Sequence, residues 1–505
     1  MNIKRAKEEI KHALQAYLAK DEFGEYKIPA VRQRPVLLMG PPGIGKTAIM
    51  EQISRECNIG LVAYTITHHT RQSAVGLPFI EKKQYGGKEY SVTEYTMSEI
   101  IASVYEKMEK TGVKEGILFI DEINCVSETL APTMLQFLQG KTFGNQRVPE
   151  GWVIIAAGNP PEYNKSVRDF DIVTLDRVKR IDVKEDYSVW KEYASKQGIH
   201  PAIVSYLDIK KENFYVMETT IDGVRFVTAR GWEDLSEVVY QYEELDIPVD
   251  EQVIAQYLQH PAVAKDFSDY LDLFNKYKND YDMEQVLLGK LDEVAAEKLQ
   301  AAPFDEKLSV ISLLLSRLSD FFQKAYVMDR YVTGLYECMK QLKKMEKENI
   351  IFVEELRKQA EEKHHQLELL KEESQSDKVN IKIENLIIHG LEKFAKEMLR
   401  NGEITFDAIR ELFQKETILR ENAINDASDK LEYAFSFMEE AFGESQEMVI
   451  FITELTRGYY SMKFIGEYGS EKYYQYNKSL LFHDTTKNIL DEIQSVKEME
   501  LETTE

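Results

Sequence analysis

The sequence has few cysteines and no long apolar segment. Its 505 residues include three widely separated cysteines, Cys57, Cys125 and Cys338. That pattern does not suit a disulfide framework or a zinc site and is typical of a reducing compartment, so we expect a cytoplasmic protein. No apolar run approaches the ~20 residues that a membrane helix needs. The charged N-terminal segment lacks the apolar core of a secretory signal. We therefore expect neither a membrane protein nor a secreted one.

Glycine, proline and net positive charge are scarce in the second half of the chain. Residues 1–240 hold 17 of the 25 glycines and 10 of the 13 prolines, and their net formal charge is −2. Residues 241–505 carry −22 of the total charge of −24. The composition therefore predicts strands, turns and helices first, and long acidic helices afterwards. An acidic surface argues against direct binding to nucleic acid, which requires cations that neutralise phosphates.

A glycine-rich stretch, GPPGIGKT, matches the pattern G-x-x-x-x-G-K-[ST] of a phosphate-binding loop. An apolar run at 35–39 precedes it and predicts a buried strand, and a helical pattern follows it. Strand, loop and helix in this order let backbone N–H groups and the helix dipole face phosphates. We expect Lys46 to reach the β- and γ-phosphates of ATP and Thr47 to ligate Mg²⁺. The loop residues are Gly40, Pro41, Pro42, Gly43, Ile44, Gly45, Lys46 and Thr47.

Two further apolar runs end in polar residues. The run ILFIDE, residues 117–122, ends in Asp121, which is placed to hold magnesium directly or through water, and in Glu122, which can act as a general base on water. The run that starts at Trp152 ends at Asn159. This amide can position the water or contact the γ-phosphate, or it can simply form the turn before two prolines.

Together these segments resemble the AAA+ ATPases over residues 30–270, and more narrowly the MoxR-like branch. The motifs that carry the resemblance are GPPGIGKT, ILFIDEIN, AAGNPPEYN, TLDRVKRIDV and TARGWEDLSEVV. The resemblance implies an α/β P-loop core with a parallel sheet flanked by helices, a helical lid and ATP hydrolysis with Mg²⁺. By position it assigns Lys46 and Thr47 to Walker A, Asp121 and Glu122 to Walker B, and Asn159 to sensor 1.

The resemblance also assigns roles to arginines. Arg177 lies where the family places its arginine finger, which reaches the nucleotide of the neighbouring subunit and stabilises transition-state charge. Arg180, expected one helical turn further, is the second candidate, and the basic cluster could instead be a solvated helix end. Arg230 matches sensor 2, although the family usually has Ser-Pro-Arg where this chain has Thr-Ala-Arg.

An insert at about 70–98 is expected to form a β-hairpin. Its centre, PFIEKKQYGGKEYSV, alternates polar and apolar residues around a Gly-Gly pair. The MoxR-like branch is similar here, with a hairpin inserted in its second helix. The hairpin is either an ordinary solvated ribbon or a contact surface, which would use Lys82, Lys83, Tyr85 and Lys88.

Three regions are predicted along the chain: an α/β nucleotide-binding core at 1–184, a helical lid at 185–275, and an acidic helical appendage at 276–505. In the appendage, residues 339–375 are nearly all good helix formers with an imperfect apolar seam. That segment predicts half of a helical hairpin or a short coiled coil, with a turn at 374–378. No motif in the appendage carries chemistry, and we interpret it as a module for assembly or partner docking.

The leading functional hypothesis is a MoxR-like ATPase that remodels or activates a protein client. An arginine finger implies a homo-oligomer, with a hexameric ring as the expected form. The family also implies a partner with a von Willebrand factor A domain. One alternative is a motor subunit of a nucleic-acid-acting restriction or defence complex, in which another subunit contacts the DNA. A nucleotide-dependent scaffold is a third reading, against which the intact Asp121–Glu122 pair argues.

Overall fold

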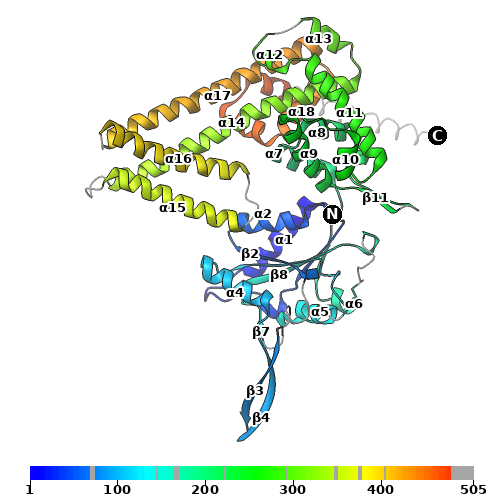
Figure 1. The fold of residues 1–505 in the computed structure, drawn as a ribbon, viewed down its shortest axis with the longest axis vertical. Coiled ribbons are helices and arrows are strands. Elements are labelled where there is room, and N and C mark those ends of the chain that lie inside the picture. Colours follow the sequence, from blue (N-terminus) through cyan, green and yellow to red (C-terminus); the bar gives the residue numbers. More distant parts are fainter. Residues whose placement is uncertain are drawn as a thin grey trace, which may run out of the picture. The chain divides into compact units, whose positions relative to one another are not determined.

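The computed structural model describes residues 1–68, 74, 76–128, 130–143, 146–163, 170–220, 223–290, 293–345, 351–373, 378–402 and 405–478. The chain forms two compact units (Figure 1). Unit 1 comprises residues 1–190, 212–235 and 257–260, and unit 2 comprises residues 191–211, 236–256 and 261–505. Each unit is therefore assembled from separate stretches of the chain.

Unit 1 is built on a five-stranded parallel sheet with the strand order β2-β5-β8-β1-β9. Its three central strands are buried along their lengths, except for the last residue of β5. Such continuous apolar runs are typical of parallel strands that are covered on both faces. The strands are β1 (Val36–Met39), β2 (Gly60–Thr65), β5 (Gly116–Asp121), β8 (Trp152–Gly158) and β9 (Lys179–Asp182).

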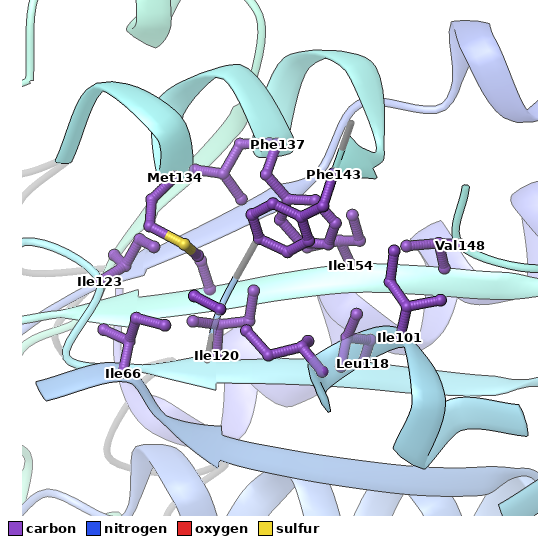
Figure 2. Packing of buried hydrophobic residues seen from close by; sticks show 14 of the residues in the cluster. Ile66, Ile101, Leu118, Ile120, Ile123, Met134, Phe137, Phe143, Val148 and Ile154 are labelled. Atoms are coloured by element: carbon purple, nitrogen blue, oxygen red, sulfur yellow. The ribbon is translucent and has the colours of Figure 1, made fainter. Parts of the chain in front are cut away.

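Helices cover both faces of this sheet. The helices α1 (Ile3–Leu18) and α2 (Lys46–Cys57) share one core cluster with Ile117 and Phe119 of β5. The helices α4 (Glu99–Thr111) and α5 (Ala131–Gly140) share the opposite cluster with Leu118 and Ile120. Figure 2 shows this second cluster, in which Phe137 and Phe143 stack with their ring centroids 4.0 Å apart. Alternate residues of one strand therefore serve two cores, which confirms the α/β class.

A long hairpin extends away from the sheet of unit 1 (Figure 1). Its strands β3 (Pro78–Tyr85) and β4 (Lys88–Tyr95) pair antiparallel. Gly86 and Gly87 form the turn with φ of 58° and 79°, as a tight two-residue hairpin turn requires. Shorter antiparallel pairs are formed by β6 (Thr142–Phe143) with β7 (Gln146–Arg147) and by β10 (Val216–Thr220) with β11 (Gly223–Val227).

The described secondary structure of unit 2 consists of helices joined by turns and loops, which confirms the expected all-α C-terminal region. Three of the described helices have residues in both units: α7 (Tyr187–Gln197) and α9 (Ala229–Glu244) begin in unit 1, and α10 (Glu251–Tyr257) has its last residue there. The others are α8 (Pro201–Ile209), α11 (Pro261–Asp280), α12 (Met283–Val286), α13 (Glu293–Gln300), α14 (Phe304–Met345), α15 (Phe352–Glu373), α16 (Lys378–Asn401), α17 (Phe406–Phe442), α18 (Gln446–Arg457) and α19 (Tyr459–Tyr468).

The segment with the imperfect apolar seam lies in α14 and α15. Leu342 at the end of α14 is buried, and Leu356, Ala360 and Leu367 bury one side of α15 in a cluster with residues of α16. The predicted turn falls largely at 374–377, outside the described residues. Among the helices that the structure describes, none is both long enough and apolar enough to cross a bilayer.

Candidate active site

The loop Gly40–Thr47 connects the end of β1 to the start of α2. Gly43 and Gly45 have φ of +73° and +87°, a backbone conformation that residues other than glycine rarely adopt. At Gly40, a Cβ atom would lie 2.9 Å from the backbone oxygen of Val183. The first N–H groups of α2 have no partner within the helix, so the loop and helix start together form a cradle for an anion such as a phosphate.

Lys46 is held at the centre of this loop and is only 9% exposed. Its Nζ donates to the backbone oxygens of Gly40 at 2.8 Å and Pro41 at 2.7 Å, and to Oδ1 of Asn159 at 2.8 Å. Burial lowers the pKa of Lys46 to about 8, and although the Asp121 carboxylate opposes this effect, Lys46 stays below its usual value. The lysine is therefore charged at neutral pH but close to its titration range.

Thr47 and Asp121 meet beside the lysine. The Thr47 hydroxyl donates to Oδ2 of Asp121 at 2.8 Å, across 74 residues of sequence. A hydroxyl and a carboxylate are the hard oxygen ligands that Mg²⁺ takes from a protein when phosphates and waters complete its shell. The two residues present thus fit a magnesium ion that is shared with a nucleotide. Among the described residues, no group of three or more His, Cys, Asp or Glu side chains forms a metal site of its own.

Glu122 follows in a strained position at the end of β5. Its φ of 56° lies in the left-handed region, which costs a non-glycine residue roughly 1–2 kcal/mol. Its N–H donates to Oδ1 of Asp121 at 2.9 Å, which helps to hold the bend. Its carboxylate Oε2 accepts from the hydroxyl of Thr67 at 3.0 Å. The backbone bend therefore aims the carboxylate toward the end of the neighbouring strand.

Thr67 was not among the residues predicted from sequence. It lies in the short 3₁₀ helix that follows β2, and β2 pairs with β5 such that Thr65 is opposite Asp121. A polar residue just after a strand was the available signal. Its use depends on knowing that β2 is the neighbour of β5, which the sequence does not state.

Asn159 follows β8 and meets two partners. Its Oδ1 accepts from Lys46, and its backbone is bound by the side chain of Asn124, a second residue that sequence reasoning missed. Asn124 is 3% exposed and belongs to the DEIN motif. The signal in the sequence was weak: a polar residue between Ile123 and the Cys125–Val126 pair.

Arg230 lies at the start of α9, beside the phosphate loop. A Cβ atom on Gly43 would lie 3.1 Å from Cβ of Thr228 and 3.6 Å from Cβ of Arg230. The Tyr215 hydroxyl also donates to the backbone oxygen of Pro42 at 3.1 Å. The positive charge of Arg230 contributes to lowering the pKa of Lys46, so the guanidinium is electrostatically coupled to the site.

Arg177 and Arg180 lie between α6 (Ile172–Leu175) and the end of β9. Arg177 is exposed, and its guanidinium donates to Gln139 near the end of α5. The expectation that Arg180 lies one helical turn after Arg177 is wrong. Arg180 is a residue of the strand β9, which pairs with β1. There its guanidinium binds Asp182 at 2.8 Å.

The structure thus brings one set of predicted residues together and keeps another apart. Lys46, Thr47, Asp121, Glu122 and Asn159 converge where β1, β5 and β8 end. This carboxyl edge of a parallel sheet is where α/β folds bind ligands. Arg230, at the start of α9, lies beside the same phosphate loop, whereas Arg177 contacts α5.

Residues 36–177 match the family model described as "ATPase family associated with various cellular activities (AAA)". The matched segment starts at β1 and ends at Arg177, so it includes the phosphate loop and the ends of β5 and β8. Unit 1 therefore contains an AAA ATPase domain. No match was found among curated proteins.

Proposed function

We propose that this protein hydrolyses ATP in a Mg²⁺-dependent reaction, as a subunit of a homo-oligomeric ring of the MoxR type. The energy of hydrolysis would remodel or activate a protein client. The observation that carries this proposal is the convergence of a phosphate loop, two adjacent carboxylates and an amide at one edge of the sheet. A scaffold that only binds nucleotide has no need of a bent, hydrogen-bonded Glu122 next to Asp121.

In this mechanism the loop glycines and Lys46 bind the β- and γ-phosphates. Glu122 orients the water that attacks the γ-phosphate and accepts its proton, and ADP leaves as its bond to the γ-phosphate breaks. The side-chain amide of Asn159, whose oxygen accepts from Lys46, helps to orient the same water. Magnesium, held by Thr47 and Asp121, would neutralise charge on the phosphate oxygens. Arg230 adds a positive charge from the start of α9.

The position of Arg177 supports the proposal that the ATPase site is shared between neighbouring subunits. Its guanidinium is exposed, and the partner that holds it is Gln139 of α5 rather than the phosphate loop. The neighbouring residues Ile172 and Val173 are 84% and 56% exposed, so an apolar surface adjoins this arginine. Exposed apolar residues beside an arginine are typical of a protein interface. In the ring, Arg177 would reach the nucleotide of the next subunit, and a hexamer is the proposed form.

The rest of the chain would link hydrolysis to the client. We assign residues 1–184 to the nucleotide-binding core with the hairpin insert at about 70–98, residues 185–275 to the lid and residues 276–505 to an appendage that docks partners. The net charge of −22 on residues 241–505 favours a partner with a basic surface. A protein with a von Willebrand factor A domain is the proposed class of partner.

The test uses the Glu122→Gln variant of the full chain. It should bind ATP as the wild type does and lose nearly all hydrolysis, because the amide cannot accept the proton from water. Affinity capture with this variant and ATP should then retain the client, whereas capture with Lys46→Ala, the matched control that weakens nucleotide binding, should not.

Two outcomes would contradict the proposal. Unchanged turnover in Glu122→Gln would remove the assigned base. Hydrolysis that is strongly stimulated by DNA, with a steep dependence on salt concentration, would show that the protein is a nucleic-acid motor and not a protein remodeller.

A further inference from the structure

Asn124 joins the segment that carries Glu122 to the segment that carries Asn159. Its Nδ2 donates to the backbone oxygen of Asn159 at 2.7 Å, and its Oδ1 accepts the N–H of Asn159 at 3.3 Å. The side-chain amide of Asn124 thus binds both the backbone N–H and the backbone oxygen of Asn159, which lies 35 residues further along the chain. Only one orientation of the amide satisfies both bonds, because the backbone oxygen must accept and the N–H must donate.

The fold keeps space for this side chain. At Gly158, immediately before Asn159, a Cβ atom would lie 2.6 Å from Oδ1 of Asn124. Any other residue at 158 would displace the asparagine. Asn124 itself is 3% exposed, so both of its bonds are shielded from competing water.

Asn124 also belongs to the turn that aims Glu122. The N–H of Ile123 donates to the backbone oxygen of Ala157 at 2.9 Å, and the N–H of Cys125 donates to that of Glu122 at 2.8 Å. The bend at Glu122 is therefore enclosed between a backbone bond to β8 on one side and the Asn124 side chain on the other. The carboxylate of Glu122 and the amide of Asn159 are the two groups that must face one water molecule.

We infer that Asn124 is a positioning residue for ATP hydrolysis: it fixes the distance between Glu122 and Asn159 without touching the nucleotide. This inference rests on the proposed ATPase function. Displacing a reacting group by about 1 Å can cost roughly 100-fold in rate. Asn124 contributes to the chemical step and leaves phosphate binding, which depends on the loop and Lys46, unchanged.

The test compares Asn124→Ala and Asn124→Asp with a control in the full-length protein. The aspartate keeps the acceptor for the N–H of Asn159 but loses the donor, and it sets a carboxylate against the Asn159 carbonyl. The control is Val126→Ala, which removes buried packing two residues away and leaves both hydrogen bonds intact. All variants are assayed for kcat, for KM and for affinity toward a fluorescent ATP analogue.

We expect kcat to fall roughly 10- to 100-fold in both Asn124 variants. KM and analogue affinity should stay within about threefold of wild type, and the control should keep kcat within about threefold. Asn124→Ala combined with Asn159→Ala should cost less free energy of activation than the sum of the two single substitutions, because the two residues belong to one hydrogen-bonded network.

Three results would overturn the inference. One is an unchanged kcat in Asn124→Ala when the wild type is active. Another is a loss of nucleotide affinity in the Asn124 variants that parallels their loss of kcat. The third is an equal loss of kcat in Val126→Ala. Either of these two results would assign Asn124 a general structural role. A wild-type protein that binds but does not hydrolyse ATP would instead contradict the proposed function, so the two failures are distinguishable.

Discussion

The hydroxyl of Thr47 and the carboxylate of Asp121 lie 2.8 Å apart, although 74 residues separate them in the chain. Thr47 is in the first turn of α2, and Asp121 is the last residue of β5. The strand β8 pairs with both β1 and β5, so the loop after β1 and the end of β5 open onto one edge. This pair is the basis of the first prediction.

Asp121→Asn should lower turnover roughly 100-fold or more, because a neutral amide neither anchors the metal nor helps to neutralise phosphate charge. Thr47→Val should also lower turnover and raise the Mg²⁺ concentration needed for half-maximal rate. Thr47→Ser, which keeps the hydroxyl, is the matched control and should remain close to wild type. Steady-state hydrolysis over a magnesium titration measures all three. Equal magnesium requirements in the valine and serine variants would exclude Thr47 as a ligand.

Arg177→Ala and Glu122→Gln subunits should each be inactive alone and should regain activity when mixed. If Arg177 acts on the next subunit, a site is complete when an Arg177→Ala subunit receives the arginine of a Glu122→Gln neighbour. Random mixing in equal amounts should restore about a quarter of the wild-type rate in a closed ring. Size-exclusion chromatography should show that the rings stay intact. Intact mixed rings without any recovery would exclude action in trans.

ATP binding should take up protons at alkaline pH. Because burial lowers the pKa of Lys46 to about 8, roughly three quarters of Lys46 is neutral at pH 8.5 in the free protein. A bound phosphate favours the charged form and raises that pKa, so protons are taken up on binding. The terminal phosphate is already ionised at this pH, since its pKa is about 6.

Titration calorimetry in two buffers of different ionisation enthalpy measures this uptake. The proton uptake should be close to zero at pH 7, where Lys46 is about nine-tenths charged and the terminal phosphate about nine-tenths ionised. The uptake at pH 8.5 should disappear in Lys46→Arg. The KM for ATP should rise as the pH increases through about 8. Uptake of the same size in the arginine variant would assign the proton to another group.

Tyr85→Ala and Lys88→Ala, at the end of the β3–β4 hairpin, should leave basal hydrolysis unchanged. The two residues are opposite each other in the ribbon, and Tyr85 is 56% exposed. A two-stranded ribbon with exposed side chains contributes little to stability, so the melting temperature should shift by no more than about 2 °C. If the hairpin contacts the client, the part of the ATPase rate that depends on client should fall. A client-dependent rate that stays intact would show an ordinary solvated hairpin.

Several features of the fold were accessible from local sequence. The apolar runs before the phosphate loop, before Asp121 and before Asn159 are buried strands, because an unbroken run suits a strand that is covered on both faces. The scarcity of glycine and proline in the second half predicted long helices, and α14 and α17 span 42 and 37 residues. The helical placement of Arg180 failed, because β9 is defined by pairing with β1 and not by its own four residues.

The sequence by itself determined which functional groups are present: a phosphate loop, two carboxylates, an amide and arginines. Local patterning also predicted whether the segment before each of these groups is a strand or a helix. Tertiary structure alone decided which of these groups meet. The order β2-β5-β8-β1-β9 sets Thr67 beside Glu122 and Asn124 against Asn159. Strand order depends on contacts between residues far apart in the chain, which no local pattern encodes. The two residues that sequence reasoning missed are therefore those whose roles depend on a neighbouring strand.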